Sequence, residues 1–348
     1  MIALAFIQVS CKKESATEPT GELPRSFRDY TWTIDSIDFA GGPRNPMELT
    51  GMWGSSPSDV WGVAGDSDPD DALWHRDATK WTRATRNTIF TNYTGYRAVY
   101  DVWGTAASDV WAVGFLHNLG VGSAMIVHYD GHAWADVTPA AVRAIDGTLY
   151  TIHATSGNDI WAAGYEYAVH FTGTSWDTCK VADSMLVASI VGQGTDVYMT
   201  AYSPWGRNLL QLFHLSNGVF QLIDQTNAYS SKFGSNLWLH DGILTSMGYN
   251  IYSNSIRSDG TVDTSAWHKD YDTGVKGIAS VYVFSSTNIV AIGSVYLVLH
   301  YNGTDWREVN IRGVNDPGNY YSSLFAQWTN GSEFYISNYH DGFVYHGK

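Results

Sequence analysis

Short apolar segments alternate with turn-forming residues along most of this chain. Three such stretches read GMWGSSPSDVWGVAG, DVWGTAASDVWAVG and TIHATSGNDIWAAG, and they begin at residues 51, 101 and 151. The core of each stretch, such as DVWAV, is almost continuously apolar instead of alternating with polar residues. Such a run indicates a short β-strand that is covered on both faces. Recurrence of one stretch at a fixed spacing indicates that the chain is built from structural repeats.

The same unit can be followed through the rest of the chain. It recurs seven times at a mean spacing of roughly 46 residues, which is in the range of propeller blades. The aligned large positions are Trp61, Trp111, Trp161, Tyr198, Trp238, Val290 and Tyr335. A second phrase follows in most copies, as in IVHYDGHAW and LVLHYNGTDW, whereas the fifth copy keeps only SDGTVDTSAW near Trp267.

Each unit is predicted to form four short strands. Asp130-Gly131 and Asn302-Gly303 are hairpin signals, because a two-residue turn needs positive φ. The bulky aromatic residues at the repeated positions would fill the wedges between neighbouring sheets. The predicted fold is therefore all-β, a seven-bladed β-propeller of four-stranded antiparallel blades.

The two ends of the chain are complementary. The seventh copy ends at Lys348 without its Trp-bearing outer strand, and RDYTWTIDSI at residues 28–37 is a spare strand that contains Trp32. We predict that this N-terminal strand closes the last blade and so removes the open sheet edge.

From about Tyr30 to Lys348 the chain resembles the bacterial lipoprotein-type β-propeller repeat proteins, whose unit reads WGxSxSDVWAVG…HYDGxxW. The resemblance is close in copies one to three and six, fair in four and seven, and poor in five. It implies a propeller fold and an extracytoplasmic setting. It transfers no catalytic residue, because the family has no single reaction.

The first eleven residues, MIALAFIQVSC, resemble a bacterial lipoprotein signal peptide. On this interpretation residues 1–10 are the signal peptide, Cys11 carries lipid, residues 11–27 form a polar tether and residues 28–348 form the propeller. The expected location is the cell envelope, as an outer-membrane lipoprotein on the periplasmic or the exposed side. The alternative is an ordinary secretory signal with an incidental cysteine. The apolar run is too short to span a membrane.

Composition narrows the expected partners. Charged residues make up 16% of the chain and aromatic residues 14%, with 34 glycines, which suits a turn-rich, well-packed β protein. The net charge of −14 and the lack of a basic stripe argue against nucleic acid. We expect a monomer that requires no cofactor.

Two polar residue types recur with the repeat, and we expect them to be structural. A ligand site needs its residues once, whereas these side chains are needed in almost every blade. The histidines are expected to bond the backbone or the acid that begins the second strand, and the acids are expected to bond their own turns. The histidines are His75, His128, His170, His214, His300 and His346, and the acids are Asp59, Asp109, Asp159 and Asp196.

Function is expected where the copies differ. Connections between the second and third strands of a unit, and between successive units, are long and dissimilar, so we nominate the face on which they open. Trp205 and Arg207 are candidates for stacking on a sugar or peptide ring, and an aromatic rim would be formed by Tyr93, Tyr96, Arg97, Tyr320 and Tyr321. Burial of the same side chains in their own blades is the alternative.

An acidic stretch is a candidate metal site. Asp66, Asp68 and Asp70 alternate, with Asp77 further on, which suits oxygen ligands for Ca²⁺, although Asp71 stands where an EF-hand loop has glycine. The alternative is a solvated acidic loop.

Three functions fit these observations. The first is a non-catalytic binding module for a glycan, a peptide or an envelope protein, because no linear nucleophile, zinc or phosphate-binding motif occurs. The alternative is a carbohydrate-active enzyme, a hydrolase or a lyase, with its site at the mouth of the central channel. Two carboxylates together with Arg or His at that mouth would favour the enzyme, and an open aromatic shelf would favour binding. A purely structural role in the envelope is a third possibility.

Overall fold

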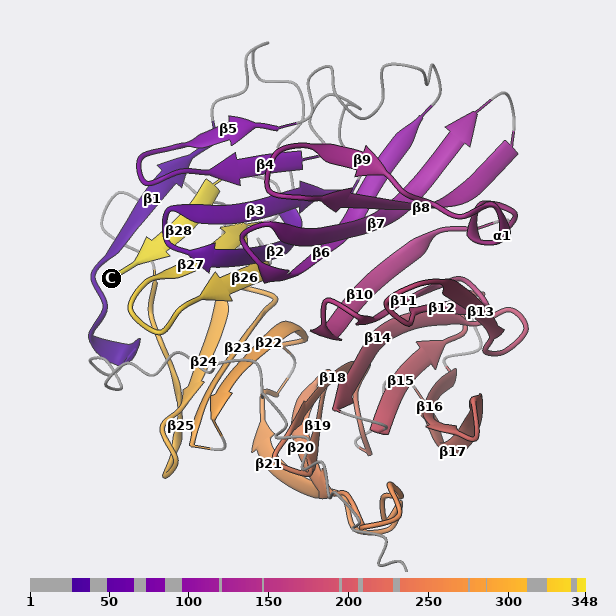
Figure 1. Ribbon diagram of the computed structural model, residues 1–348. Coiled ribbons are helices and arrows are strands. Elements are labelled where there is room, and N and C mark those ends of the chain that lie inside the picture. Colours follow the sequence, from indigo (N-terminus) through magenta and orange to yellow (C-terminus); the bar gives the residue numbers. More distant parts are fainter. Residues whose placement is uncertain are drawn as a thin grey trace, which may run out of the picture.

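Seven four-stranded antiparallel sheets follow one another around a ring in the computed structural model (Figure 1). The structure describes residues 27–37, 49–65, 73–84, 96–118, 121–145, 147–193, 196–205, 209–227, 232–274, 276–285, 287–311, 324–338 and 343–348. This is the predicted seven-bladed β-propeller. Helix is confined in the described residues to one turn of 3₁₀ helix (Phe27–Asp29) and the short helix α1 (Ala140–Arg143).

The strands of the first four blades are consecutive in the chain. Blade 1 consists of β2 (Leu49–Ser56), β3 (Asp59–Ala64), β4 (Leu73–Arg76) and β5 (Trp81–Arg83). Blade 2 consists of β6 (Arg97–Ala106), β7 (Asp109–Asn118), β8 (Val121–Tyr129) and β9 (Trp134–Asp136). Blade 3 consists of β10 (Leu149–Ser156), β11 (Asp159–Gly164), β12 (Tyr167–Phe171) and β13 (Trp176–Lys180). Blade 4 consists of β14 (Leu186–Gln193), β15 (Asp196–Tyr202), β16 (Leu209–Ser216) and β17 (Val219–Asn227).

The remaining blades complete the ring. Blade 5 consists of β18 (Asn236–His240), β19 (Ile243–Met247), β20 (Asn250–Ser255) and β21 (His268–Asp272). Blade 6 consists of β22 (Ile278–Ser285), β23 (Asn288–Gly293), β24 (Leu297–Tyr301) and β25 (Trp306–Glu308). Blade 7 consists of β26 (Leu324–Thr329), β27 (Phe334–Asn338), β28 (Phe343–Gly347) and, from the other end of the chain, β1 (Trp32–Ser36).

The predicted closure by the N-terminal strand is confirmed. β1 pairs antiparallel with β28, with Trp32 opposite Gly347, and the indigo β1 lies beside the yellow β28 (Figure 1). The N–H of Thr31 donates to the carbonyl of Lys348 at 2.9 Å, and the N–H of Lys348 donates back at 3.1 Å. Blade 7 is thus built from both ends of the chain, and its outer edge is paired instead of open.

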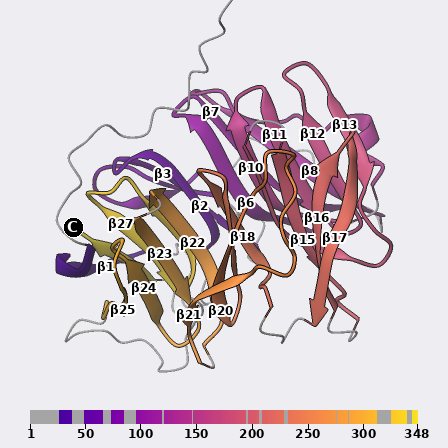
Figure 2. The same cartoon turned by 90° about the horizontal axis from the view of Figure 1, so that it is seen from below.

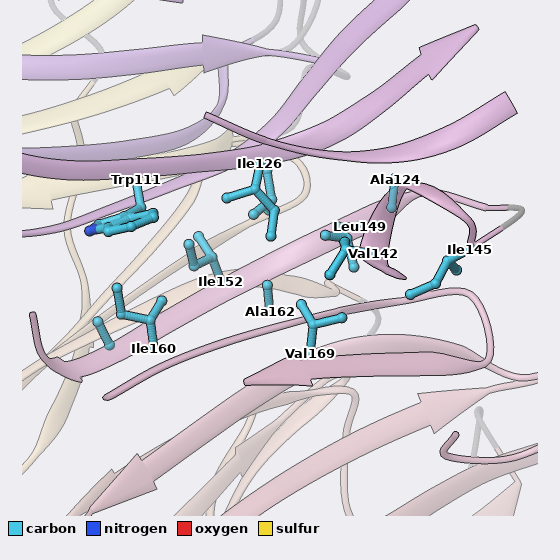
Figure 3. Packing of buried hydrophobic residues seen from close by; sticks show 12 residues of the cluster. Trp111, Ala124, Ile126, Val142, Ile145, Leu149, Ile152, Ile160, Ala162 and Val169 are labelled. Carbon is cyan, nitrogen blue, oxygen red and sulfur yellow. The ribbon is translucent and has the colours of Figure 1, made fainter. Parts of the chain in front are cut away.

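Apolar side chains fill the wedges between blades. Between blades 2 and 3, Trp111 and Ile126 face Ile152 and Ile160 across the gap (Figure 3). Val142 on α1 covers the same cluster and is completely buried. The nearly continuous apolar segments such as DVWAV therefore form second strands that are covered by a blade on each side, as predicted.

One predicted alignment is wrong. Trp238 lies on β18, the first strand of blade 5, and pairs with Thr245 on the second strand β19. Trp53 on β2 pairs with Trp61 on β3 in the same way, so Trp238 corresponds to Trp53 and Thr245 corresponds to Trp61. The local phrase SNLWLHDG resembles a second strand, but register is decided by pairing between strands.

A second difference concerns the connection after Phe115. The stretch FLHNLGVGS is one of the connections between second and third strands that the sequence predicts to be long loops. Instead, β7 and β8 continue through most of it as a paired hairpin, from Phe115 opposite Ala124 to Asn118 opposite Val121. Blade 2 therefore has longer strands than blade 1, and it extends further at that end of the ring (Figure 1).

Five of the six repeated histidines bond a side chain at the start of the second strand, as the structural interpretation predicts, whereas Nε2 of His214 lies 3.7 Å from Asp196. Nε2 of His128 lies 2.8 Å from Oδ1 of Asp109, and His75 with Asp59 and His170 with Asp159 repeat the same distance. The acids also accept from a hydroxyl at the end of the first strand, as Asp59 does from Ser55 and Asp109 does from Thr105, instead of bonding their own turn backbone. Each pair ties the second strand of its blade to the third and fixes their register.

Candidate functional site

The propeller has two faces of different character. The turns between strands one and two, and between strands three and four, open on one face, which we call the tight-turn face. These turns are short except in blade 5, where residues 256–267 connect β20 to β21. The connections between strands two and three, and between successive blades, open on the other, which we call the variable face. The expectation that all of these connections are long is wrong for blades 3 and 5, where residues 165–166 and 248–249 form two-residue turns between strands two and three. Each first strand begins at the variable face and runs toward the tight-turn face. The position of a residue along this strand therefore gives its distance from the variable face along the central channel.

The first strands of all seven blades surround a central cavity of about 290 Å³. β2, β6, β18 and β22 lie near the middle of the ring in Figure 2. Strand register places their side chains on three levels. The level nearest the variable face consists of Thr50, Tyr100, Tyr150, Ala188, Ala279 and Phe325. The middle level consists of Gly51, Asp101, Thr151, Ser189, Asn236, Ser280 and Ala326. The level nearest the tight-turn face consists of Trp53, Trp103, His153, Val191, Trp238, Tyr282 and Trp328.

Side chains of the tight-turn level reach sideways onto the next blade. Trp53 packs against Gly104, where a Cβ atom would lie 2.7 Å from the indole carbons. Nε1 of Trp103 donates to the carbonyl of Ala154 at 3.1 Å, and Nε2 of His153 lies 3.2 Å from the carbonyl oxygen of Gly192. This level therefore joins consecutive blades and narrows the channel with aromatic rings.

Asp101 dominates the middle level. Its Oδ1 accepts from the N–H of Val102 and its Oδ2 accepts from the N–H of Ile152 on the next blade, both at 2.9 Å. Gly51 makes room for this carboxylate, since a Cβ atom there would lie 2.7 Å from Oδ1. Burial raises the pKa of Asp101 to about 7, although both N–H groups favour the ionised form. Asp101 is thus a cross-blade tie that titrates near neutral pH.

The channel wall carries little other charge. Among the described lining residues, Asp101 is the single carboxylate and His153 is the single imidazole, and there is no Lys or Arg. Burial lowers the pKa of His153, although the Gly192 carbonyl and Asp159 oppose that shift, so its imidazole is neutral at pH 7. Glycoside hydrolysis generally uses a pair of carboxylates, and the described lining supplies one.

The mouth of the channel on the variable face is aromatic. The rings of Tyr100 and Tyr150, on the first strands of blades 2 and 3, have centroids 4.8 Å apart. Tyr202 ends the second strand of blade 4, and burial together with the nearby Tyr150 raises the pKa of its hydroxyl. Tyrosines from three successive blades therefore gather at the mouth on this face.

Exposed aromatic side chains lie further out on the same face. Trp205, in the connection after β15, exposes 74% of its surface, Tyr249 between β19 and β20 exposes 41%, and Tyr96 before β6 exposes 42%. In the part of the chain that the structure describes, these are the exposed aromatic residues, and all of them lie on the variable face. The side chain of Val295, between β23 and β24, is 46% exposed on the same face. Its backbone φ is 56°, which is strained for a β-branched residue.

The structure describes three of the residues that the sequence nominates for stacking and for the aromatic rim. Trp205 is exposed as a stacking residue must be, and Tyr96 is exposed while packing at 6.5 Å from Phe115. Arg97 lies on β6 and is half-buried. The other nominated rim and stacking residues, Arg207, Tyr93, Tyr320 and Tyr321, lie outside the described residues, as does Cys11.

The proposed calcium ligands Asp66, Asp68 and Asp70 also lie outside the described residues. Within the described ranges, no group of three or more His, Cys, Asp or Glu side chains is placed to hold a metal ion.

Sequence reasoning missed Tyr100, Tyr150, Tyr249 and Val295. A signal was available for the first two. Both tyrosines lie at the same position of the first strand, and the residue at that position differs from blade to blade. In blades 1, 2, 3, 4, 6 and 7 it is Thr50, Tyr100, Tyr150, Ala188, Ala279 and Phe325. Such variation inside an otherwise regular strand indicates that packing does not fix the residue at this position.

No protein-family model and no curated protein matches this sequence. Its fold is similar to that of several solved propellers. YCF48 bound to D1 peptide superposes with a TM-score of 0.62 at 14% identity over 90% of this chain and 96% of that one. YCF48 from Cyanidioschyzon merolae gives 0.61 at 12% identity over 90% and 98%. The WD40 propeller of Doa1 gives 0.58 at 11% identity over 92% and 97%.

These similarities, all well below 25% identity, establish the fold. An extracellular domain of a two-component-system protein from B. thetaiotaomicron is similar in the same way, with a TM-score of 0.60 at 13% identity over 91% of this chain and 39% of that one.

Proposed function

We propose that this protein is a non-catalytic binding module that holds a peptide segment of a partner protein against its variable face. One observation carries the proposal: the exposed aromatic side chains of the described chain, Trp205, Tyr249 and Tyr96, all lie on that face. Exposed aromatic residues on a rigid scaffold are typical of contact surfaces. The tyrosines at the channel mouth would continue the same surface inward.

A peptide suits this surface better than a charged ligand. The described channel lining carries one carboxylate, with no Lys or Arg to bind an anion, and the net charge of −14 disfavours acidic partners. The similar propeller YCF48 has been solved with a peptide bound. A neutral or basic segment with apolar side chains is therefore the ligand class that we propose.

The second part of the proposal concerns location. We propose that the module is lipid-anchored at Cys11 on the outside of the cytoplasmic membrane, on the strength of the sequence of residues 1–15. In the part of the chain that the structure describes, no helix is both long and apolar enough to cross a bilayer. Incorporation of a labelled fatty acid into wild-type protein and its absence from Cys11→Ser would support the anchor, and labelling of both or of neither would contradict it.

Peptide and glycan arrays on one preparation test the binding function. We expect peptide hits that weaken by at least about tenfold in Trp205→Ala, because an exposed aromatic residue that anchors a ligand contributes more than 1.4 kcal/mol. Val219→Ala is the matched control, since Val219 is 55% exposed and begins β17, next to a turn on the opposite face. Hits confined to glycans, or peptide hits that Trp205→Ala leaves unchanged, would overturn the proposal.

A further inference from the structure

Aromatic residues on the second strands normally seal the boundaries between blades. Trp61 of blade 1 packs between Tyr129 and Trp134 of blade 2, with ring centroids 4.8 and 5.1 Å away. Trp111 of blade 2 packs in the same way against Phe171 and Trp176 of blade 3, at 5.5 and 5.8 Å. A pair of aromatic rings on one blade thus receives one ring from the preceding blade.

The boundary between blades 5 and 6 has the receiving pair but lacks the inserted ring. Tyr301 and Trp306 of blade 6 lie 5.2 Å apart at 30°, close to the 5.6 Å and 40° of Tyr129 and Trp134. The position that carries Trp61 in blade 1 carries Thr245 in blade 5.

The other repeated residues of that blade are also replaced. Ser253 pairs with Thr245 and occupies the place of the repeated histidine, and Ile243 occupies the place of the repeated acid. At the following boundary the corresponding residue is Val290, but there Tyr30, Trp32 and Phe334 join its buried cluster. The change in blade 5 therefore affects the whole motif and leaves the receiving side of blade 6 intact.

A cavity of about 480 Å³ occupies this place. It is lined by Thr245, Ser253, Asp270 and Tyr271 of blade 5 and by Tyr301 and Trp306 of blade 6. Tyr271 contacts the outer side of this space, 5.8 Å from Trp306, without filling it. The volume lies in the range of small-molecule and side-chain pockets.

The cavity lies toward the tight-turn face. His240 and Ile243 beside the turn between β18 and β19, and Thr304 in the turn between β24 and β25, contribute to its wall. It is therefore separate from the variable face on which the exposed aromatic side chains lie.

A hydrogen-bond acceptor lies in the wall. Asp270 accepts from the hydroxyl of Ser253 at 3.1 Å, and its Oδ1 lies 2.9 Å from Nδ1 of His268. In blade 2 the indole Nε1 of Trp111 donates to a carboxylate, that of Asp109, at 2.8 Å. A carboxylate beside an aromatic slot suits a ring that carries an N–H or O–H donor.

We propose that the cavity between blades 5 and 6 binds an aromatic side chain, indole or phenol, that a peptide ligand supplies in place of the missing second-strand ring. The other boundaries of the same molecule show which group fits against such a pair of rings. The site is independent of the variable face, so either proposal can fail without the other.

Titration of the full chain with N-acetyl-L-tryptophanamide, followed by calorimetry, tests the site. We expect saturable binding at one equivalent, and no binding of N-acetyl-L-leucinamide at up to about 10 mM. Thr245→Trp should fill the cavity from within, weaken the tryptophanamide by at least about tenfold and raise the thermal midpoint. Thr245→Val, which keeps the size of the side chain and hence the cavity, should bind as the wild type does.

Further variants separate the outcomes. Trp306→Leu removes half of the receiving pair and should abolish binding even if Thr245→Trp does not fold. Trp205→Ala, on the variable face, should leave the affinity unchanged. The proposal is wrong if the wild type does not bind the tryptophanamide, if leucinamide binds equally well, or if the affinity survives Thr245→Trp or Trp306→Leu.

Discussion

The indole ring of Trp53 lies directly against Gly104 on the neighbouring blade, with no room for a methyl group between them. Trp328 and Gly54 repeat the relationship one blade earlier, where a Cβ atom would lie 2.9 Å from the indole. The glycines of the Trp-Gly phrases at residues 53–54 and 103–104 are thereby explained, because each accommodates the tryptophan of the preceding blade. On the blade after Trp103 the corresponding residue is Ala154, whose carbonyl accepts from the Trp103 indole.

Gly104→Ala should therefore destabilise the ring. The new methyl group would lie 2.7 Å from Trp53, and overpacking of this kind costs about 1–3 kcal/mol. Urea unfolding at neutral pH measures the change. Gly277→Ala is the matched control, because the nearest atom to its new Cβ lies 3.9 Å away and its free energy of unfolding should hardly change. Equal stabilities of the two variants would contradict the packing argument.

Trp32→Ala should weaken the closure of the ring. Trp32 packs at 6.1 Å from Phe334 and lies against Gly347, so its loss leaves a cavity across the joint between the two ends of the chain. For this half-buried ring we expect a loss of about 2–4 kcal/mol in the free energy of unfolding. Thr31→Ala, exposed on the same segment, keeps the backbone bonds to Lys348 and should have little effect. A wild-type midpoint for Trp32→Ala would show that closure does not depend on this ring.

Asp109→Asn should make the protein less sensitive to acid. Burial by itself would raise the pKa of Asp109, but hydrogen bonds from His128, Thr105 and Trp111 hold it below the ordinary 3.8. The stabilisation from this lowered pKa is present above pH 3.8 and is lost as the pH falls below that value toward the folded-state pKa.

Thermal unfolding between pH 6 and pH 2.5 measures the effect. The variant should be less stable at pH 6 by about 1–3 kcal/mol, and the difference from the wild type should shrink in acid. Asp177→Asn, at an exposed position on β13, should show a constant difference. A gap for Asp109→Asn that stays constant down to the lowest pH would rule out this role.

Asp101 should produce the opposite dependence on pH in a different range. Burial raises its folded-state pKa to about 7 from 3.8, so the folded protein holds a proton that the unfolded chain has lost. The wild type should therefore lose stability relative to Asp101→Asn as the pH rises from about 4 to about 7, with no further change above. Chemical unfolding at fixed pH steps measures this, with Asp177→Asn as the flat control. A relative gain by the wild type over that range would show that the N–H groups of Val102 and Ile152 outweigh burial.

The blade count and the ring closure could be predicted from residues close together in the chain. DVWAV around Trp111 is nearly continuously apolar because a blade covers each of its faces. Trp32 stands in a predicted strand before the first full copy, and the last copy in the sequence lacks its outer strand. Both signals can be read from the linear sequence, because every blade buries its two faces with the same short pattern of residues. The histidine ties were predictable for the same reason.

The position of Trp238 could not be predicted in this way. First and second strands of a blade both carry a bulky aromatic residue near the tight turn, so the local phrase fits either strand. Only the pairing of Trp238 with Thr245 decides which strand it is, because register is a relation between segments.

Local patterns along the chain are enough to predict the architecture and the face on which most connections vary, because repeated apolar segments and their interruptions are properties of neighbouring residues. The folded ring is needed to show where side chains of different blades meet: Tyr100 next to Tyr150, Asp101 bonded to the N–H of Ile152, and a cavity between Thr245 and Trp306. This cavity exists because the small side chain of Thr245 lies opposite the large ring of Trp306. Which residue lies opposite Thr245 is known only from the packing of blade 5 against blade 6.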